Sequence, residues 1–134
     1  MGYSNFISAN RRAQVALNIF DKITRGEEFS DAMLFSLSHK NFILPNGEEG
    51  SLFMFALAMN EFVPALYLLE NDRVFDSRED IIAALKDVLS NIEEKDISRL
   101  DDNNEVENGI KQRYLKNIEA RDIIVERYPE KTRA

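Results

Sequence analysis

Residues 52–59 form an unbroken apolar run, Leu-Phe-Met-Phe-Ala-Leu-Ala-Met, which limits the possible folds more than any other feature. Periodicity alone would also allow a strand, but Ala and Met favour a helix and Ser51 is a good N-cap. A helix that is apolar around its circumference must be buried on most sides. Its expected partner is a helix at 62–71, in which Pro64 fits the first turn. The sequence therefore predicts a buried helical hairpin at 51–71.

Apolar residues at helical spacing predict four further helices. Two lie before the hairpin, at 10–24 and 30–38. The most regular lies at 77–92, where six aliphatic side chains share one face. The last is predicted at 105–128 and stops before Pro129. At 1.5 Å per residue it would be about 36 Å long, so it must cross the whole domain or project from it.

The phenylalanines predict where the core lies, because all nine stand at or before position 75. Aromatic burial is a large single-residue contribution to a core, so the core is expected over residues 6–92. The chain is interpreted as one all-α domain spanning 1–134, a compact bundle of about five to six helices. The helix at 105–128 either covers one side of this core or supplies an interface. Its apolar stripe keeps no strict heptad, so a long coiled coil is not expected.

The most conspicuous loop precedes the hairpin. Pro45-Asn46-Gly47 is a strong turn signal. Residues 45–92 carry nine acidic and three basic side chains, in a chain of net charge −7. Such a surface repels nucleic acid, whose binding depends on Lys and Arg, and attracts a basic protein surface. We therefore expect partner contacts at Leu44, Asn46, Glu48, Glu49, Phe62 and Tyr67.

Several classes of chemistry find no support in the sequence. The absence of cysteine excludes thiolate catalysis, Cys-ligated zinc and disulfides. No apolar run reaches the roughly 18–20 residues that span a bilayer, and no signal-peptide pattern starts the chain. A cytoplasmic protein without membrane contact is expected, although export without an N-terminal signal stays open.

The remaining candidates for a metal or catalytic site have simpler interpretations. His39, the single histidine, is expected to cap the end of a short helix. An EF-hand loop starting at Asp101 would need Gly at position 106 and Glu at 112, but Val106 and Gln112 stand there. No catalytic residue, metal ligand or cofactor is predicted.

The segment 46–72 resembles one ankyrin repeat, in which a turn precedes two antiparallel helices. Ser51 stands at the family's Thr, Ala56-Leu57 at its Ala-Ala pair, Asn60 at its Gly and Leu68-Leu69 at its closing leucine pair. Leu52-Phe53-Met54 departs from the family's Pro-Leu-His, and no second copy follows at a period near 33 residues. The resemblance implies protein binding through turns and inner helices, without catalysis.

Together these features predict a non-catalytic protein-interaction module, an adaptor or an inhibitor of a larger partner, with a possible homodimer through the C-terminal helix. One alternative is an acidic nucleic-acid mimic that blocks a DNA-binding protein. Another is a small enzyme that uses carboxylates in a surface cleft. A mimic should bind basic proteins in a strongly salt-dependent way, whereas an enzyme requires a pocket with a buried acid.

Overall fold

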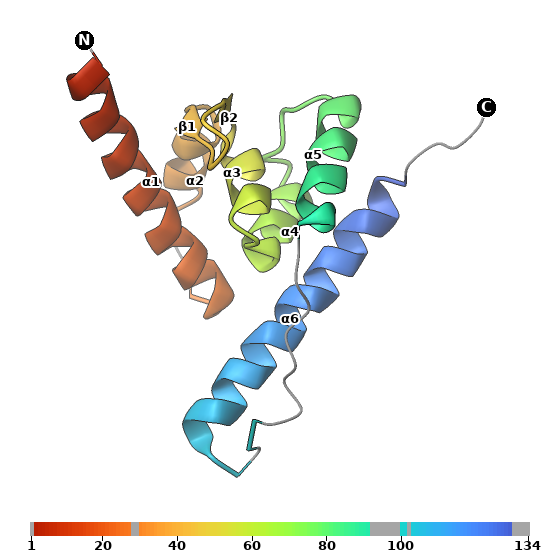
Figure 1. Ribbon diagram of the computed structural model, residues 1–134. Helices are drawn as coiled ribbons and strands as arrows, with labels where there is room; N and C mark the ends of the chain where they lie inside the picture. The colour runs from red at the N-terminus through yellow and green to blue at the C-terminus, as the bar shows by residue number, and fades with distance from the viewer. Residues whose placement is uncertain (1, 28–29, 92–99, 102, 130–134) are drawn as a thin grey trace.

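The computed structural model describes residues 2–27, 30–91, 100–101 and 103–129, with side chains from residue 11 onward (Figure 1). Within these ranges it contains six helices and one two-stranded antiparallel ribbon. The predicted all-α fold with a long C-terminal helix is therefore confirmed. In chain order the elements are α1 (Gly2–Thr24), α2 (Asp31–Ser38), β1 (Phe42–Ile43), β2 (Glu49–Gly50), α3 (Leu52–Ala58), α4 (Phe62–Glu70), α5 (Arg78–Ser90) and α6 (Glu105–Arg127).

Three helices begin at a serine, a residue type that is favoured at the N-cap position. The hydroxyl oxygens of Ser30, Ser51 and Ser77 each accept a hydrogen bond from the backbone N–H three residues later, at 3.1–3.4 Å. Each bond satisfies an N–H that has no partner inside its helix. The first helix differs from the prediction, because it starts at Gly2 rather than near residue 10. No proline interrupts that segment, so nothing prevents the helix from extending through it.

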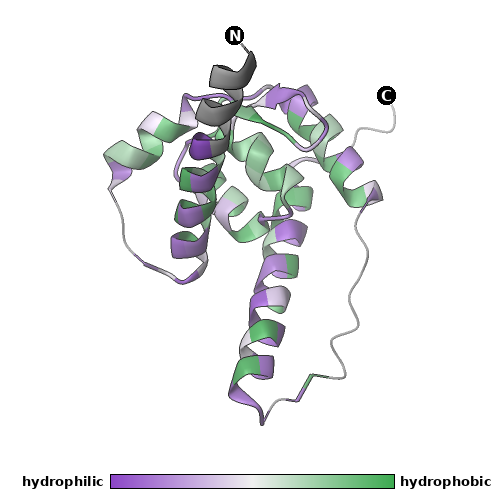
Figure 2. Ribbon diagram, turned by 60° about the vertical axis from the view of Figure 1, so that its left-hand side comes forward, coloured by the Kyte–Doolittle hydropathy of each residue, from purple (hydrophilic) through white to green (hydrophobic). Residues whose placement is uncertain are grey.

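The short helix α3 lies at the centre of the molecule, as its apolar circumference requires. Five of its seven residues are at most 3% exposed. It contacts α2, α4, α5 and both strands, and α1 reaches it through the Phe20 and Phe55 rings, whose centroids are 6.1 Å apart. Hydrophobic residues accordingly gather where the helices meet (Figure 2).

The ribbon of β1 and β2 packs on α3 through one ring and one glycine. Phe42 is fully buried and stacks on Phe55, with ring centroids 5.3 Å apart. A Cβ at Gly50 would lie 3.1 Å from Met54 Cβ and 2.9 Å from Leu44 Cδ1. The absence of a side chain at Gly50 therefore lets the ribbon approach α3 closely. Gly47, with φ +87°, forms the predicted turn between the strands.

The expected limits of the core need two corrections. Ala120 and Ile124 of α6 are buried against the bundle, so the core extends beyond residues 6–92. Conversely, Phe35 and Phe75 are about half exposed, with His39 packed between their rings. Aromatic content alone therefore failed in two ways: it included phenylalanines that are half exposed, and it omitted the buried residues of α6.

The helix α6 packs mainly against α4, and its N-terminal half projects beyond the bundle (Figure 1). One half of the helix therefore covers the core, as one interpretation predicted, whereas the interface predicted by the other stays a prediction. In the described part of the chain, no helix combines the length and the apolar character needed to cross a membrane. Leu100, which precedes α6 in the chain, is half-buried.

Candidate functional site

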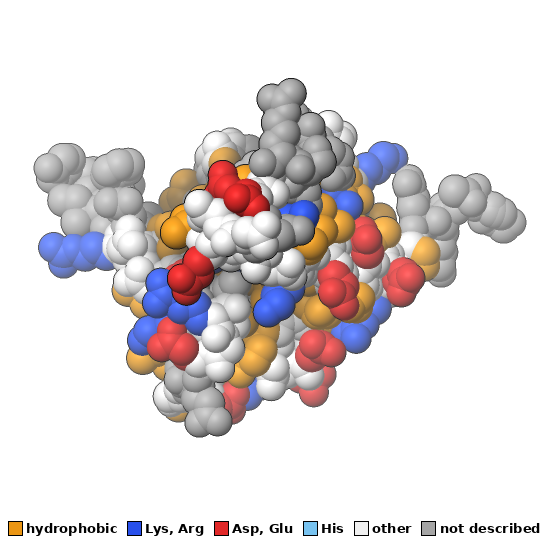
Figure 3. Space-filling model, turned by 90° about the horizontal axis from the view of Figure 1, so that it is seen from below, with side chains coloured by type: hydrophobic (Ala, Val, Ile, Leu, Met, Phe, Trp, Pro, Cys, Tyr) orange, Lys and Arg blue, Asp and Glu red, His pale blue; other side chains and the backbone are white. Residues whose placement is uncertain are grey.

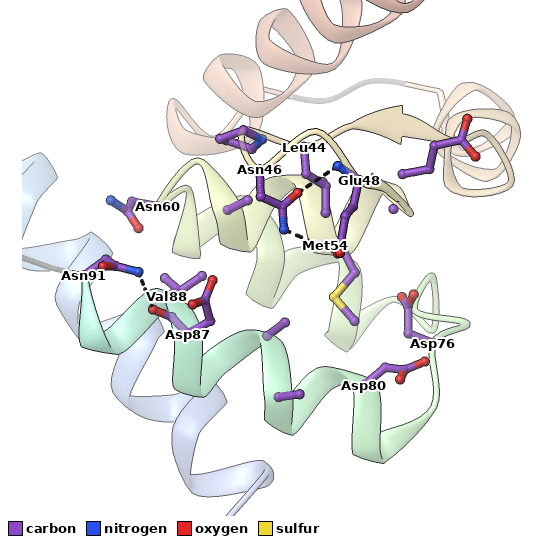
Figure 4. A pocket seen from close by; sticks show the side chains of 16 residues that line it. Leu44, Asn46, Glu48, Met54, Asn60, Asp76, Asp80, Asp87, Val88 and Asn91 are labelled. Atoms are coloured by element: carbon purple, nitrogen blue, oxygen red, sulfur yellow. Dashed lines mark hydrogen bonds between the residues drawn. The ribbon is translucent and has the colours of Figure 1, made fainter.

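A groove of about 890 Å³ opens between the loop that joins the two strands, the end of α3 and one face of α5 (Figure 4). Three separate stretches of the chain build it, so it exists only in the folded protein. The residues that line it are Leu44, Pro45, Asn46, Glu48, Glu49, Gly50, Met54, Ala58, Asn60, Asp76, Asp80, Ala83, Ala84, Asp87, Val88 and Asn91.

The apolar part of the groove consists of small or flexible side chains. Leu44, Met54 and Val88 are each half-buried, and they pack against the edge of the core. The small side chains of Ala58 in α3 and Ala84 in α5 leave space in the groove over these helices. A thioether such as that of Met54 adapts to partners of different shape. This part of the groove can therefore accept apolar side chains from outside.

The polar part of the groove is acidic. Five carboxylates belong to it: Glu48, Glu49, Asp76, Asp80 and Asp87. Among the described residues that line it there is no Lys or Arg. Asp80 and Asp87 are seven residues apart on α5 and therefore share one helix face. Such a concentration of like charge attracts cations and basic side chains.

Hydrogen bonds hold the acidic residues of the loops in place. The backbone N–H of Glu48 donates to Asn46 Oδ1 at 2.9 Å, and Asn46 Nδ2 donates to Glu48 Oε2 at 3.4 Å (Figure 4). On the opposite side, Ser51 Oγ donates to Asp76 Oδ2 at 2.7 Å. Ser51 also caps α3, so the same hydroxyl fixes a helix start and one carboxylate of the groove.

The structure brings four of the six predicted contact residues together. Leu44, Asn46, Glu48 and Glu49 all line the groove. Phe62 does not, since it is only 2% exposed and belongs to the core, and this prediction is corrected. Tyr67 is 37% exposed but does not line the groove. In a helix as apolar as α4, the spacing of the apolar residues does not show which of them face the core.

The contribution of α5 and of the loop before it was missed by sequence reasoning. Asp80, Ala83, Ala84, Asp87, Val88 and Asn91 repeat at spacings of three and four residues, and they form the face beside the buried one that contains Ile81 and Leu85. This periodic signal is present in the sequence. What could not be read from it is that the loop at 44–50 lies across from that face.

Two other features bear on chemistry. The His39 ring lies against Phe35 and Phe75, with centroid distances of 4.4 and 4.6 Å, and does not line the groove. Its expected place at the end of a helix is correct, because it is the C-cap residue of α2. Among the described residues, no group of three or more His, Asp or Glu side chains could hold a metal ion.

Comparisons with protein-family models, with curated proteins and with solved structures find no match to this chain. Any functional conclusion therefore rests on the geometry of the groove. Its combination of apolar surface and unopposed negative charge suits recognition of a positively charged, partly apolar ligand.

Proposed function

We propose that the protein is a non-catalytic interaction module, an adaptor or inhibitor, whose groove binds a basic segment of a larger protein. The observation that carries the proposal is the presence of five carboxylates around an apolar surface, with no basic side chain among the described lining residues. Lys or Arg side chains of the partner would offset this charge. Apolar side chains between them would remove Leu44, Met54 and Val88 from water, which supplies affinity that charge alone does not.

The exposure of the carboxylates favours recognition over acid–base catalysis. Asp80 and Asp87 are exposed on α5, and Glu48 and Glu49 are exposed in the loop. A general acid usually owes its reactivity to burial, which stabilises its neutral form. Exposed carboxylates instead act through charge, and the strength of their interactions depends on salt.

The resemblance to an ankyrin repeat supports the same proposal. A tight ribbon, two short antiparallel helices and a turn between them follow one another over residues 42–70. Asn60, at the position where that family has Gly, has a φ of +58°, a conformation that glycine adopts at little cost. In such a unit the ribbon and the inner helix form the binding surface, and here both contribute to the groove.

A defined probe tests the proposal before any natural partner is known. The probe is a synthetic amphipathic peptide of Lys and Leu, and its counterpart has Glu in place of Lys. We expect the wild-type chain to bind the basic peptide and not the acidic one. The double variant Asp80→Lys, Asp87→Lys should bind the basic peptide roughly tenfold more weakly or worse, which corresponds to about 1.4 kcal/mol. Isothermal titration calorimetry at two salt concentrations measures both affinities.

The matched control is Glu119→Lys, Glu126→Lys. These two glutamates are also exposed and seven residues apart, but they lie on α6 outside the groove. The control makes the same change in net charge, so it should retain most of the affinity. Equal losses in the two double variants would mean that only net charge matters, and the groove proposal would then be rejected. Circular dichroism establishes that both variants are folded.

A further inference from the structure

The carboxylates that α5 contributes to the groove form one row with a fixed spacing. Asp80 and Asp87 are both exposed and both line the groove. They lie within about 20° of each other around the helix and about 10.5 Å apart along its axis. Arg78 and Lys86, the basic residues of α5, stand at least about 100° around the helix from Asp87 and do not line the groove. The row therefore presents only negative charge to the groove.

The apolar residues of α5 lie directly beside this row. Ala84 and Val88 also line the groove, at about 60° and 100° around the helix from Asp87. Farther round in the same direction come the buried side chains of Ile81 and Leu85. The carboxylates thus stand at the outer edge of the groove, and the apolar side chains lie deeper, next to the core.

The loop between the two strands forms the opposite edge of the groove. Asn46 holds Glu48 there through the two hydrogen bonds described above. Met54 extends from α3 into the space between this loop and α5 (Figure 4). Acidic residues therefore lie on two sides of the apolar part. The face of the molecule seen from below differs, because basic and acidic side chains are interspersed on it (Figure 3).

We propose that the groove binds an amphipathic α-helix whose Lys or Arg residues, seven positions apart, flank a stripe of apolar side chains. The helix is one form of the basic segment proposed above, so its binding presupposes that function of the groove. Basic residues seven apart on a helix are separated by about 10.5 Å, which is the spacing of Asp80 and Asp87. A strand places residues of one face about 6.6 or 13 Å apart, and neither spacing matches.

The size and the floor of the groove suit such a helix. Two turns of α-helix, about 11 Å long and 10 Å across, occupy roughly 850 Å³, and the groove measures about 890 Å³. Ala83 and Ala84 carry the smallest side chains that a second helix could meet on α5, so the two helices can approach closely. The apolar stripe of the bound helix would then contact Met54 and Val88.

Two peptides of identical composition test the helical form of the ligand. Both are about 14 residues of Lys, Leu and Ala; in one, Leu and Lys recur at helical spacing, and in the other they alternate as in a strand. We expect the helical isomer to bind at least about tenfold more tightly in isothermal titration calorimetry. A free peptide of this length is at best marginally helical in water. Circular dichroism should therefore show more helix in the mixture than in the separate components.

Exchange of two residues on α5 tests the spacing of the carboxylates. The double variant Ala83→Asp, Asp87→Ala keeps the composition and net charge but leaves the carboxylates three residues apart, about 4.5 Å along the axis. It should bind the helical isomer about threefold to fivefold more weakly, because exposed ion pairs contribute modestly. The matched control is Gln112→Glu, Glu119→Gln, an exchange between exposed positions of α6 outside the groove, which should retain the wild-type affinity. Equal affinities of the two exchange variants would overturn the spacing.

The outcomes separate this proposal from the function on which it rests. If both isomers bind the wild type equally, or the helical isomer binds without a gain in helix, the helical ligand is rejected. The function of the groove then still stands if Asp80→Lys, Asp87→Lys weakens the binding of both isomers. Binding of neither isomer would reject both proposals. Circular dichroism of each variant alone establishes that it is folded.

Discussion

The side-chain amide of Asn117, in α6, caps the backbone at Phe62, where α4 begins. Asn117 Oδ1 accepts hydrogen bonds from the N–H groups of Phe62 at 2.9 Å and Val63 at 3.3 Å, and Asn117 Nδ2 donates to Asn60 O at 2.8 Å. Glu61, at the N-cap position, provides no side-chain bond of its own. A residue 55 positions away in sequence thus performs the role that a local Ser or Asp usually performs.

Replacement of Asn117 by Ala should lower the free energy of unfolding by about 1–2 kcal/mol, because two backbone N–H groups lose their acceptor. Chemical denaturation with urea measures the change. Alanine is the better helix former, so helix propensity would act in the opposite direction. The control Asn108→Ala, in the same helix and outside this contact, should be neutral or slightly stabilising. A similar effect from both variants would show that the cap carries no stability.

Glu61→Gln should stabilise the protein at neutral pH. Burial raises the pKa of the Glu61 carboxyl above its ordinary value of 4.5; the nearby Arg113 lowers it and Asp21 raises it further, with burial the largest cause. The folded state therefore favours the protonated form, and stability is lost as pH rises through this raised pKa. The advantage of Gln should be full above that pKa and should vanish below pH 4.5. Unfolding curves of both proteins from pH 3.5 to 8 test this, and a difference that does not vary with pH would contradict it.

Gly50→Ala should disturb the groove from within. The new Cβ would meet Leu44 Cδ1 and Met54 Cβ, so Leu44 must move and the ribbon must lift from α3. We expect a loss of about 1–2 kcal/mol in unfolding free energy together with weaker binding of the basic peptide. Gly47→Ala is the matched comparison, because its positive φ also costs about 1–2 kcal/mol although its Cβ would contact nothing within 4 Å. Gly47→Ala should therefore lose stability but retain the peptide affinity of the wild type.

Ala83→Trp should block the groove without changing its charge. Ala83 is exposed on α5 and lines the groove, so a large ring there would occupy the space expected for the partner segment. Peptide binding should fall roughly tenfold or more, while surface substitutions of this kind usually change stability by less than about 0.5 kcal/mol. Ala32→Trp, at an exposed position of α2 outside the groove, is the control. Unchanged binding by Ala83→Trp would mean that the acidic charge attracts the peptide but that the peptide does not occupy the groove.

Local signals predicted the elements well. Ser30, Ser51 and Ser77 each cap a helix, and Gly47 forms the expected turn, because these roles depend on the residue and its immediate neighbours. The groove itself was not predicted, but four of the residues that line it were predicted as partner contacts from the turn signal at 45–47. The α5 side of the groove was not predicted, since two segments that meet across a groove share no local pattern.

The sequence by itself determined the helical class, the helical hairpin and the long last helix, because periodicity, capping and proline act over a few residues. Only the tertiary structure decided that Asn117 caps α4, that Phe62 is buried while Phe75 is exposed, and that five acidic residues line one groove. The physical reason is that these relationships depend on how the helices pack against one another. Side chains of similar hydrophobicity can be buried or exposed according to which helix lies opposite them.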